Sequence, residues 1–137
     1  MLNSKGASLS DIKVIQLELK SHDRSHLVAY DEIYKAGAIR CFSISALANQ
    51  DRGNHSHILS RQWFVVMGGR VTIEVFDGKD KLQHLLLETN EVLFVPAGIW
   101  SRQIYSAKSN LLVFTDTQYE ESDYIRSLSD YLKWKSE

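Results

Sequence analysis

Two histidines separated by a single residue are the part of this chain best suited to chemistry. His55 and His57 lie in a segment of strand-like sequence, where alternate side chains share one face about 7 Å apart along the chain. An imidazole titrates near pH 6.5, so such a pair can serve as general acid and base or can bind a metal ion. The choice between these roles depends on the residues that the fold places around the pair.

A metal centre at the histidine pair would need further ligands from elsewhere in the chain. Catalytic zinc and iron sites take three or four nitrogen or oxygen ligands. Gln62, before the apolar run that follows the pair, is a poor ligand, and Ser101, after the segment Pro96–Trp100, is a worse one. The other three histidines, His22, His26 and His84, do not lie at the spacing that the family resemblance described below implies for metal ligands. We therefore expect no metal and no other cofactor, and a further role for Gln62 as a partner that fixes the tautomer of a histidine.

Length and composition predict one globular domain over residues 1–137. The chain has 44% hydrophobic and 24% charged residues, one proline and no low-complexity linker. A net charge of −1 argues against nucleic acid and membrane surfaces as partners. Cys41 is the single cysteine, expected as a small buried residue, and it fits a reducing compartment. The polar first 13 residues lack the apolar core of a signal peptide, so we expect a cytoplasmic protein.

Short apolar or alternating segments make up most of the chain. They cover residues 15–19, 27–30, 38–45, 63–67, 71–76, 82–88, 91–95 and 111–115. The run 63–67 is typical of a strand covered on both faces, and Asp77-Gly78 predicts a hairpin turn after the alternating segment 71–76. Strands at this spacing predict an all-β barrel or jelly roll with a core of about 12–118.

The last residues follow a different period. Apolar and aromatic side chains recur at helical spacing after Ser122, which is a plausible N-cap, and Asp123 would lie in the first turn. We therefore predict one amphipathic C-terminal helix over about 123–134.

Several motifs together resemble the sugar 3,4-ketoisomerases, a family of cupins that includes WxcM-like C-terminal domains. The matching segments are Arg52-Gly53-Asn54-His55-Ser56-His57, Gln62, Asp77-Gly78, Pro96-Ala97-Gly98-Ile99-Trp100 and Tyr119-Glu120-Glu121-Ser122-Asp123-Tyr124-Ile125-Arg126. The resemblance runs from about Ile12 to Leu132. It implies a jelly-roll cupin fold, a homodimer with exchanged strands, and metal-independent action on dTDP-4-keto-6-deoxyglucose. The expected setting is deoxyaminosugar and surface polysaccharide (lipopolysaccharide O-antigen) biosynthesis.

Some positions depart from the family pattern. The segment 22–27 keeps Arg24 but loses the rest of an N-terminal motif, and the tyrosines that often follow the arginine aligned with Arg40 are replaced by Phe42 and Ser43. A lost phenol removes a candidate proton donor or sugar contact. These changes bear on substrate and product stereochemistry more than on the histidine pair.

Moving a ketone from carbon 4 to carbon 3 needs a base, an acid and stabilisation of an enediolate. We expect His57 to act on carbon and His55 to move protons between oxygens or polarise the ketone, although the sequence leaves the two roles exchangeable. The resemblance and the lack of a Gly-rich phosphate loop make Arg24, Arg40 and Arg52 candidates for the diphosphate. Trp100 is a candidate to stack on the base or wall off the sugar.

Two other functions fit parts of the sequence. The chain could be a binding module that holds a nucleotide sugar without converting it and supports a separate acyltransferase, since Phe42, Ser43 and Ser101 remove titratable groups. It could also be a metal-dependent cupin enzyme. Metal analysis and hydrogen exchange into the sugar separate the three.

Overall fold

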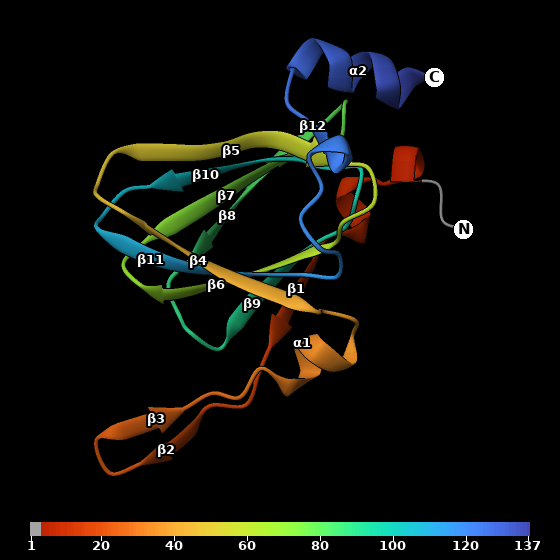
Figure 1. Cartoon of the computed structure of the whole chain (residues 1–137). Coiled ribbons are helices and arrows are strands. Elements are labelled where there is room, and N and C mark those ends of the chain that lie inside the picture. Colours follow the sequence, from red (N-terminus) through yellow and green to blue (C-terminus); the bar gives the residue numbers. More distant parts are fainter. Residues whose placement is uncertain (1–3) are drawn as a thin grey trace.

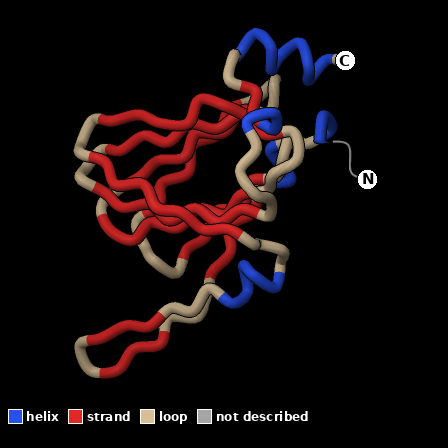
Figure 2. Tube along the Cα trace, viewed as in Figure 1, coloured by secondary structure: helices blue, strands red, loops and turns tan. Residues whose placement is uncertain are grey.

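Two facing antiparallel sheets form the body of the molecule in the computed structural model, which describes residues 4–137 (Figures 1 and 2). One sheet has the strand order β1-β9-β6-β11-β4 and the other β12-β5-β10-β7-β8. The strands are β1 (Lys13–Gln16), β4 (Arg40–Ala46), β5 (Gln50–His57), β6 (Gln62–Gly68), β7 (Val71–Phe76), β8 (Lys81–Leu86), β9 (Glu91–Val95), β10 (Trp100–Tyr105), β11 (Ser109–Thr115) and β12 (Tyr124–Ile125). This arrangement confirms the predicted all-β, cupin-type fold. Residues 1–3 of the range expected as one domain lie outside the described residues.

The space between the sheets holds the main core. Alternate residues of β7, namely Val71, Ile73 and Val75, are fully buried there, while the residues between them are half-buried, as the alternation predicts. Phe64 on β6 of the opposite sheet packs in the same core cluster as these residues. By the same alternation, Gln62 at the start of β6 also faces the interior.

The outer face of the β1-β9-β6-β11-β4 sheet carries a second apolar cluster. Trp63 and Val65 on β6 are buried on this face, so the strand is covered on both sides, as its continuous apolar sequence predicts. A short helix, α1 (Asp31–Lys35), buries Ile33 against this cluster. The sequence analysis missed α1, because five residues are too few to show a helical period. Cys41 on β4 is exposed, and the expectation that it is buried is wrong.

A tight turn joins β7 to β8 where Asp77-Gly78 predicts one. The carboxylate of Asp77 accepts hydrogen bonds from the backbone N–H groups of Lys79 and Asp80, each at 2.9 Å. Gly78 has φ +97°, a conformation that residues with a side chain rarely adopt. The turn fixes the register of the β7–β8 pair, in which Val75 lies opposite Leu82.

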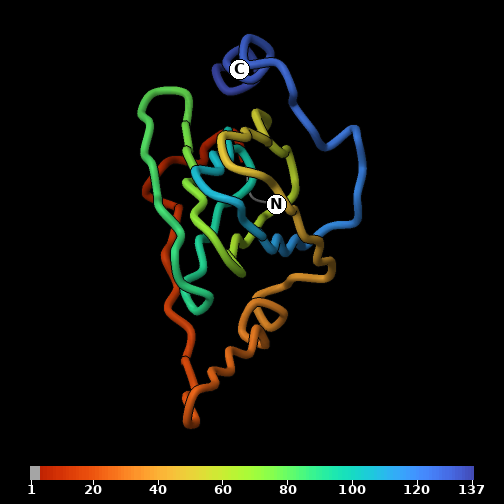
Figure 3. Tube along the Cα trace, turned by 90° about the vertical axis from the view of Figure 1, so that its left-hand side faces the viewer, coloured from red at the N-terminus to blue at the C-terminus, as the bar shows by residue number. Residues whose placement is uncertain are grey.

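A second hairpin projects away from the sheets. It is formed by β2 (Lys20–His22) and β3 (Ser25–Leu27), all of whose residues are exposed, and Figures 1 and 3 show it at the end of the molecule opposite the C-terminal helix. The predicted strands 15–19 and 27–30 are therefore only partly correct. The first ends at Gln16, and of the second only Leu27 is in a strand, while residues 28–30 form a loop that leads into α1.

The C-terminal segment differs from the prediction at its start. Asp123, expected at the start of the helix, ends a 3-10 turn (Glu121–Asp123), the next two residues form the strand β12, and the helix α2 spans Leu128–Ser136. Its N-cap is Ser127, whose side chain accepts from the N–H of Asp130, and not Ser122. Two further 3-10 turns, Ser4–Gly6 and Leu9–Asp11, precede β1. Within residues 4–137 no helix is long and apolar enough to cross a membrane.

Candidate active site

Strand β5 turns both imidazoles toward the space between the sheets. His55 lies opposite Ser101 of β10, and the two histidine rings are 5.0 Å apart between centroids and nearly perpendicular. A bulge precedes the pair, where Gly53 (φ +91°) and Asn54 (φ +58°) adopt left-handed backbone conformations. A Cβ at position 53 would lie 3.1 Å from the Ser101 carbonyl oxygen, which accounts for the glycine.

The two-residue strand β12 covers the end of β5. Tyr124 pairs with His57 across the ladder, and its ring centroid lies 4.4 Å from that of His57 and 4.9 Å from that of His55. The tail motif is thus part of the site, although its residues from Asp123 onward were predicted as the start of the C-terminal helix. Through this strand the tail motif covers both imidazoles.

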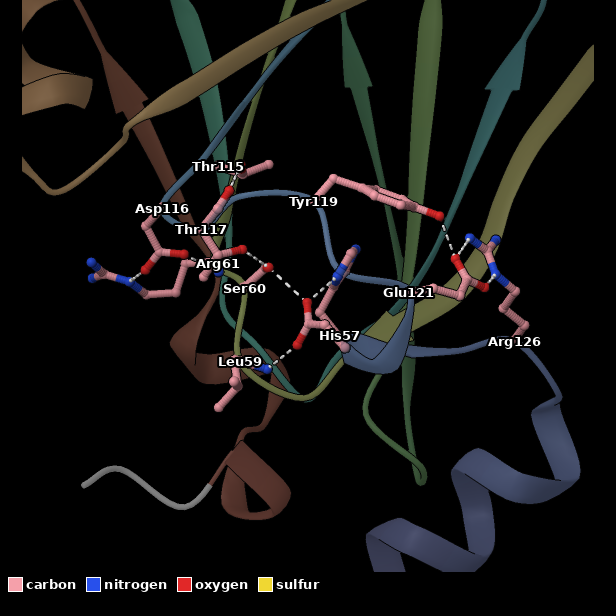
Figure 4. A network of polar contacts seen from close by, with 11 residues as sticks. His57, Leu59, Ser60, Arg61, Thr115, Asp116, Thr117, Tyr119, Glu121 and Arg126 are labelled. Carbon is pink, nitrogen blue, oxygen red and sulfur yellow. Dashed lines mark hydrogen bonds and ion pairs between the residues drawn. The ribbon is translucent and has the colours of Figure 1, made fainter.

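Asp123, immediately before β12, is buried against His57. Its Oδ2 accepts a hydrogen bond from His57 Nδ1 at 2.7 Å and another from Ser60 Oγ at 2.7 Å, and its Oδ1 accepts from the Leu59 N–H at 2.6 Å (Figure 4). Burial by itself would raise the pKa of this carboxyl, but the bonds from His57, Ser60 and Leu59 outweigh it and lower the pKa to about 2. The role of histidine partner that was expected of Gln62 therefore belongs to Asp123.

The other nitrogen of His57 has no hydrogen-bond partner among the described residues. Nε2 is buried, and no group in residues 4–137 forms a hydrogen bond with it. An ionised carboxylate can only accept, so its contact with His57 requires a proton on Nδ1, and in the neutral ring Nε2 then keeps its lone pair. A buried imidazole nitrogen without a protein partner is suited to take a proton from a ligand.

His55 is held in its neutral form. Burial of the ring and the neighbouring His57 lower its pKa from 6.5 to about 4, with a smaller effect from Arg126, while the Gly53 carbonyl opposes the shift. At neutral pH His55 is therefore an uncharged group that can both accept and donate a hydrogen bond.

This shift predicts that the protein loses stability on the acid side. An unfolded imidazole binds its proton near pH 6.5 and the folded His55 only near pH 4, so protons favour the unfolded chain between these values. We expect the free energy of unfolding to fall by about 2 kcal/mol between about pH 7 and 4.5 through this group, with allowance for partial exposure of the ring. Urea unfolding should show this extra loss in the wild type relative to His55→Asn. An equal loss in both proteins would contradict the buried neutral imidazole.

The residues around the pair do not form a metal-ligand set. Ser101 occupies the position opposite His55, and Gln62 lies on the neighbouring sheet. In the part of the chain from residue 4 onward, no three His, Cys, Asp or Glu side chains are grouped so that they could hold a metal ion.

Arg40 shares the barrel interior with the histidines. It starts β4 opposite Thr115, on the inner face by alternation with Phe42, and its guanidinium carbon lies 4.8 Å from the ring centroid of Phe42 and 5.7 Å from that of Tyr119. Between residues 4 and 137 it has no ion-pair partner. A half-buried, uncompensated guanidinium is a suitable anion-binding group.

The other predicted binding residues lie in different surroundings. Arg52, on β5 opposite Gln103, is exposed but shares the inner face. Trp100 is on the outer face of β10, and its ring centroid lies 5.6 Å from that of Tyr131 of α2. Within a single chain Trp100 is therefore not in contact with the histidines. Arg24 lies at the tip of the projecting hairpin, away from β12 and the histidines (Figures 1 and 3).

Three polar residues beside the site were missed by the sequence analysis. Glu121 pairs with Arg126 through both carboxylate oxygens, at 2.6 and 2.9 Å, and accepts from the Tyr119 hydroxyl at 2.5 Å (Figure 4). The hydrogen bonds from Arg126 and Tyr119 lower the pKa of Glu121 to about 2. The Arg126 guanidinium in turn lies 4.2 Å from the Tyr124 ring centroid. The tail motif contains all three residues, but nothing in its spacing shows that they meet.

Two surface hollows of about 350 Å³ each lie away from the histidines. One is at the opposite end of the barrel, beside Gly69 and Ser109, and the other lies between the N-terminal turns and α2. Neither is lined by His55, His57, Arg40, Arg52 or Gln62.

The fold and the site define a cupin-like barrel with a histidine pair in its interior and an aspartate behind one ring. The chain belongs to the family described as FdtA: WxcM-like, C-terminal, whose model matches residues 10–136. No curated protein matches the sequence significantly.

Solved structures of sugar ketoisomerases share the fold. A 3,4-ketoisomerase from Helicobacter canadensis is 25% identical over 93% of this chain and 98% of its own, with a TM-score of 0.87. WlaRA, a TDP-fucose-3,4-ketoisomerase from Campylobacter jejuni, is 25% identical over 91% and 96%, with a TM-score of 0.82. QdtA from Thermoanaerobacterium thermosaccharolyticum, solved with TDP, is 21% identical over 94% and 97%, with a TM-score of 0.86. A mutant of QdtA has been solved with TDP-4-keto-6-deoxyglucose.

Proposed function

We propose that this protein is a sugar-nucleotide 3,4-ketoisomerase. It moves the keto group of a dTDP-4-keto-6-deoxyhexose from carbon 4 to carbon 3 without a metal or other cofactor. The observation that carries the proposal is the pair of inward imidazoles, of which His57 presents a buried Nε2 with no partner in residues 4–137. The family and the described activities of similar structures support the same reaction.

The reaction needs one proton moved between carbons and one between oxygens. His57 Nε2 takes the proton from carbon 3, which is acidic because it neighbours the carbonyl, and the electron pair moves onto the carbon 4 oxygen. The resulting enediolate is reprotonated at carbon 4. His55, neutral because its pKa is lowered to about 4, passes the proton of the carbon 3 hydroxyl to the carbon 4 oxygen. The product is the 3-keto isomer, and no atom is gained or lost.

Arginines of the inner face bind the diphosphate in this proposal. Arg40 is the strongest candidate because its guanidinium is half-buried and has no carboxylate partner between residues 4 and 137, whereas Arg52, on the inner face of β5 with the histidines, is exposed. Gln62, buried near the same end of the barrel, is placed to hydrogen-bond the sugar. QdtA, of similar fold, was solved with TDP, which supports a dTDP-linked ligand.

A homodimer with exchanged N-terminal strands belongs to the same proposal. An isolated two-stranded hairpin is marginally stable in water, yet β2–β3 projects with Leu27 56% exposed. Packing of this hairpin against a second copy would cover Leu27 and bring Arg24 to the partner's site. Sedimentation should give twice the chain mass, and a monomer at micromolar concentration would contradict the dimer.

The proposed setting is a cytoplasmic step of deoxyaminosugar and surface polysaccharide biosynthesis.

Hydrogen exchange tests substrate class and reaction together. The protein is incubated with dTDP-4-keto-6-deoxyglucose in deuterated water and the sugar is followed by NMR. We expect deuterium in the ring as the 3-keto product forms, because reprotonation draws on solvent. The double variant His55→Asn/His57→Asn is the control. If the wild type binds the sugar nucleotide but leaves its ring protons unexchanged, the isomerase proposal is wrong.

A binding module is the second candidate function. Phe42 places an apolar ring on the inner face beside Arg40, where the resemblance expects a phenol, and this favours binding without turnover. Binding without exchange in the same experiment would support this function. A stoichiometric transition metal in the purified protein would instead support a metal-dependent cupin enzyme.

A further inference from the structure

Asp123 is fixed to the end of β5 by four hydrogen bonds. Its carboxylate accepts from His57 Nδ1, Ser60 Oγ and the Leu59 N–H at 2.6 to 2.7 Å, and its carbonyl accepts from the Ile58 N–H at 2.9 Å. The residue is 7% exposed. Because both carboxylate oxygens and the backbone carbonyl of Asp123 accept hydrogen bonds, its side chain has little freedom to turn away from the imidazole of His57.

The carboxylate is ionised at neutral pH. The hydrogen bonds that it accepts outweigh its burial and lower its pKa to about 2. An ionised carboxylate has acceptors only, so its contact with His57 requires a proton on Nδ1. The neutral ring can carry one proton, and Nε2 is then the free base.

We propose that Asp123 is a positioning residue that holds His57 in the tautomer with a proton on Nδ1 and aims its Nε2 at the ligand. This inference rests on the proposed function, and it names the residue that makes one imidazole of the pair the base. The carboxylate does not touch the substrate. It orients the ring and stabilises the imidazolium that forms when Nε2 takes a proton.

A purely structural role for Asp123 makes a different prediction. The contacts with Leu59 and Ser60 also tie the segment 116–126 to the barrel, so loss of the carboxylate could act through stability alone. Asp116 provides a matched control on the same segment. It is a half-buried carboxylate that accepts from the Arg61 backbone N–H at 2.8 Å and from Arg61 Nε at 2.6 Å, and it does not contact either histidine.

The tautomer can be measured without activity and without a variant. Nitrogen NMR of the protein labelled with ¹⁵N-histidine, at about pH 8 where an ordinary imidazole is neutral, distinguishes a protonated from a bare ring nitrogen. We expect His57 in the wild type and in Asp116→Asn to show a protonated Nδ1 and a bare Nε2. In Asp123→Asn the amide can donate as well as accept, so both tautomers should be populated.

Steady-state kinetics distinguish a loss of His57 positioning from a loss of substrate binding. We expect Asp123→Asn to lower kcat about 10- to 100-fold with KM changed less than about threefold, because the carboxylate supports the base and does not touch the sugar. Asp116→Asn should keep kcat within about threefold of the wild type. Thermal unfolding of both variants shows how much of each effect is stability.

Two results would overturn the inference. One is a wild-type His57 that carries its proton on Nε2, and the other is Asp123→Asn with wild-type kcat. If the wild type catalyses no isomerisation, the proposed function fails, and the nitrogen spectrum still decides whether Asp123 sets the tautomer. The two failures are therefore distinguishable.

Discussion

His57→Asn lowers kcat of the isomerisation by at least about 10²-fold, while the variant keeps its fold. Removal of a positioned acid–base group costs about 10²- to 10⁴-fold in rate, and asparagine can keep one hydrogen bond to Asp123 but offers no basic nitrogen. His55→Asn is expected to lose a similar factor, because the proton transfer between oxygens also needs an imidazole. The measurement is turnover of dTDP-4-keto-6-deoxyglucose, with circular dichroism to check the fold.

The two variants also decide which histidine acts on carbon. If His57 is the carbon base, His57→Asn abolishes exchange of the carbon 3 proton with solvent, whereas His55→Asn retains measurable exchange while product formation is slow. His84→Asn is the matched control, because His84 is a half-buried imidazole that pairs with Glu91 at 3.1 Å, away from the site. It should keep wild-type turnover. Full activity in the double variant His55→Asn/His57→Asn would rule out histidine catalysis.

Most strands were predicted well because the sequence patterns that indicate them are local. The alternation in β7, the apolar run of β6 and the turn at Asp77-Gly78 each reflect burial of one strand against its neighbours. The C-terminal helix was placed too early for the same reason. Tyr124 and Ile125 fit a helical period, but they are held in an extended conformation by pairing with β5, a contact about 70 residues away in sequence. Long-range pairing overrode the local pattern.

The site was predicted in part. The histidine spacing correctly placed both rings on one face, and alternation puts Arg40 and Gln62 on the inner face as well. Asp123 was missed because its residue type suits a helix N-terminus equally well, and only the course of the chain from β11 to β12 brings it to His57. Trp100 was proposed as a contact of the base or the sugar. As the neighbour of Ser101, which faces the interior, it lies on the opposite face of β10.

Arg40→Met weakens binding of TDP about 10- to 100-fold and leaves kcat within about threefold. A hydrogen bond to a charged group contributes about 1.5–3 kcal/mol, and about 1.4 kcal/mol corresponds to a factor of ten in Kd. Methionine keeps an unbranched apolar side chain beside Phe42 but removes the charge, so the loss reports on the anion contact rather than on packing. Titration calorimetry with TDP at two salt concentrations measures the effect, and the salt dependence should be weaker in the variant.

Arg70→Met is the control for this prediction. Arg70 is exposed in the turn between β6 and β7, at the end of the barrel opposite β12, so its loss changes the net charge equally without touching the proposed site. Equal weakening by both variants would mean that TDP responds to overall charge and that Arg40 is no specific ligand. Weakening confined to Arg40→Met would place the diphosphate at the same end of the barrel interior as the two imidazoles, which is the arrangement that proton transfer on the attached sugar requires.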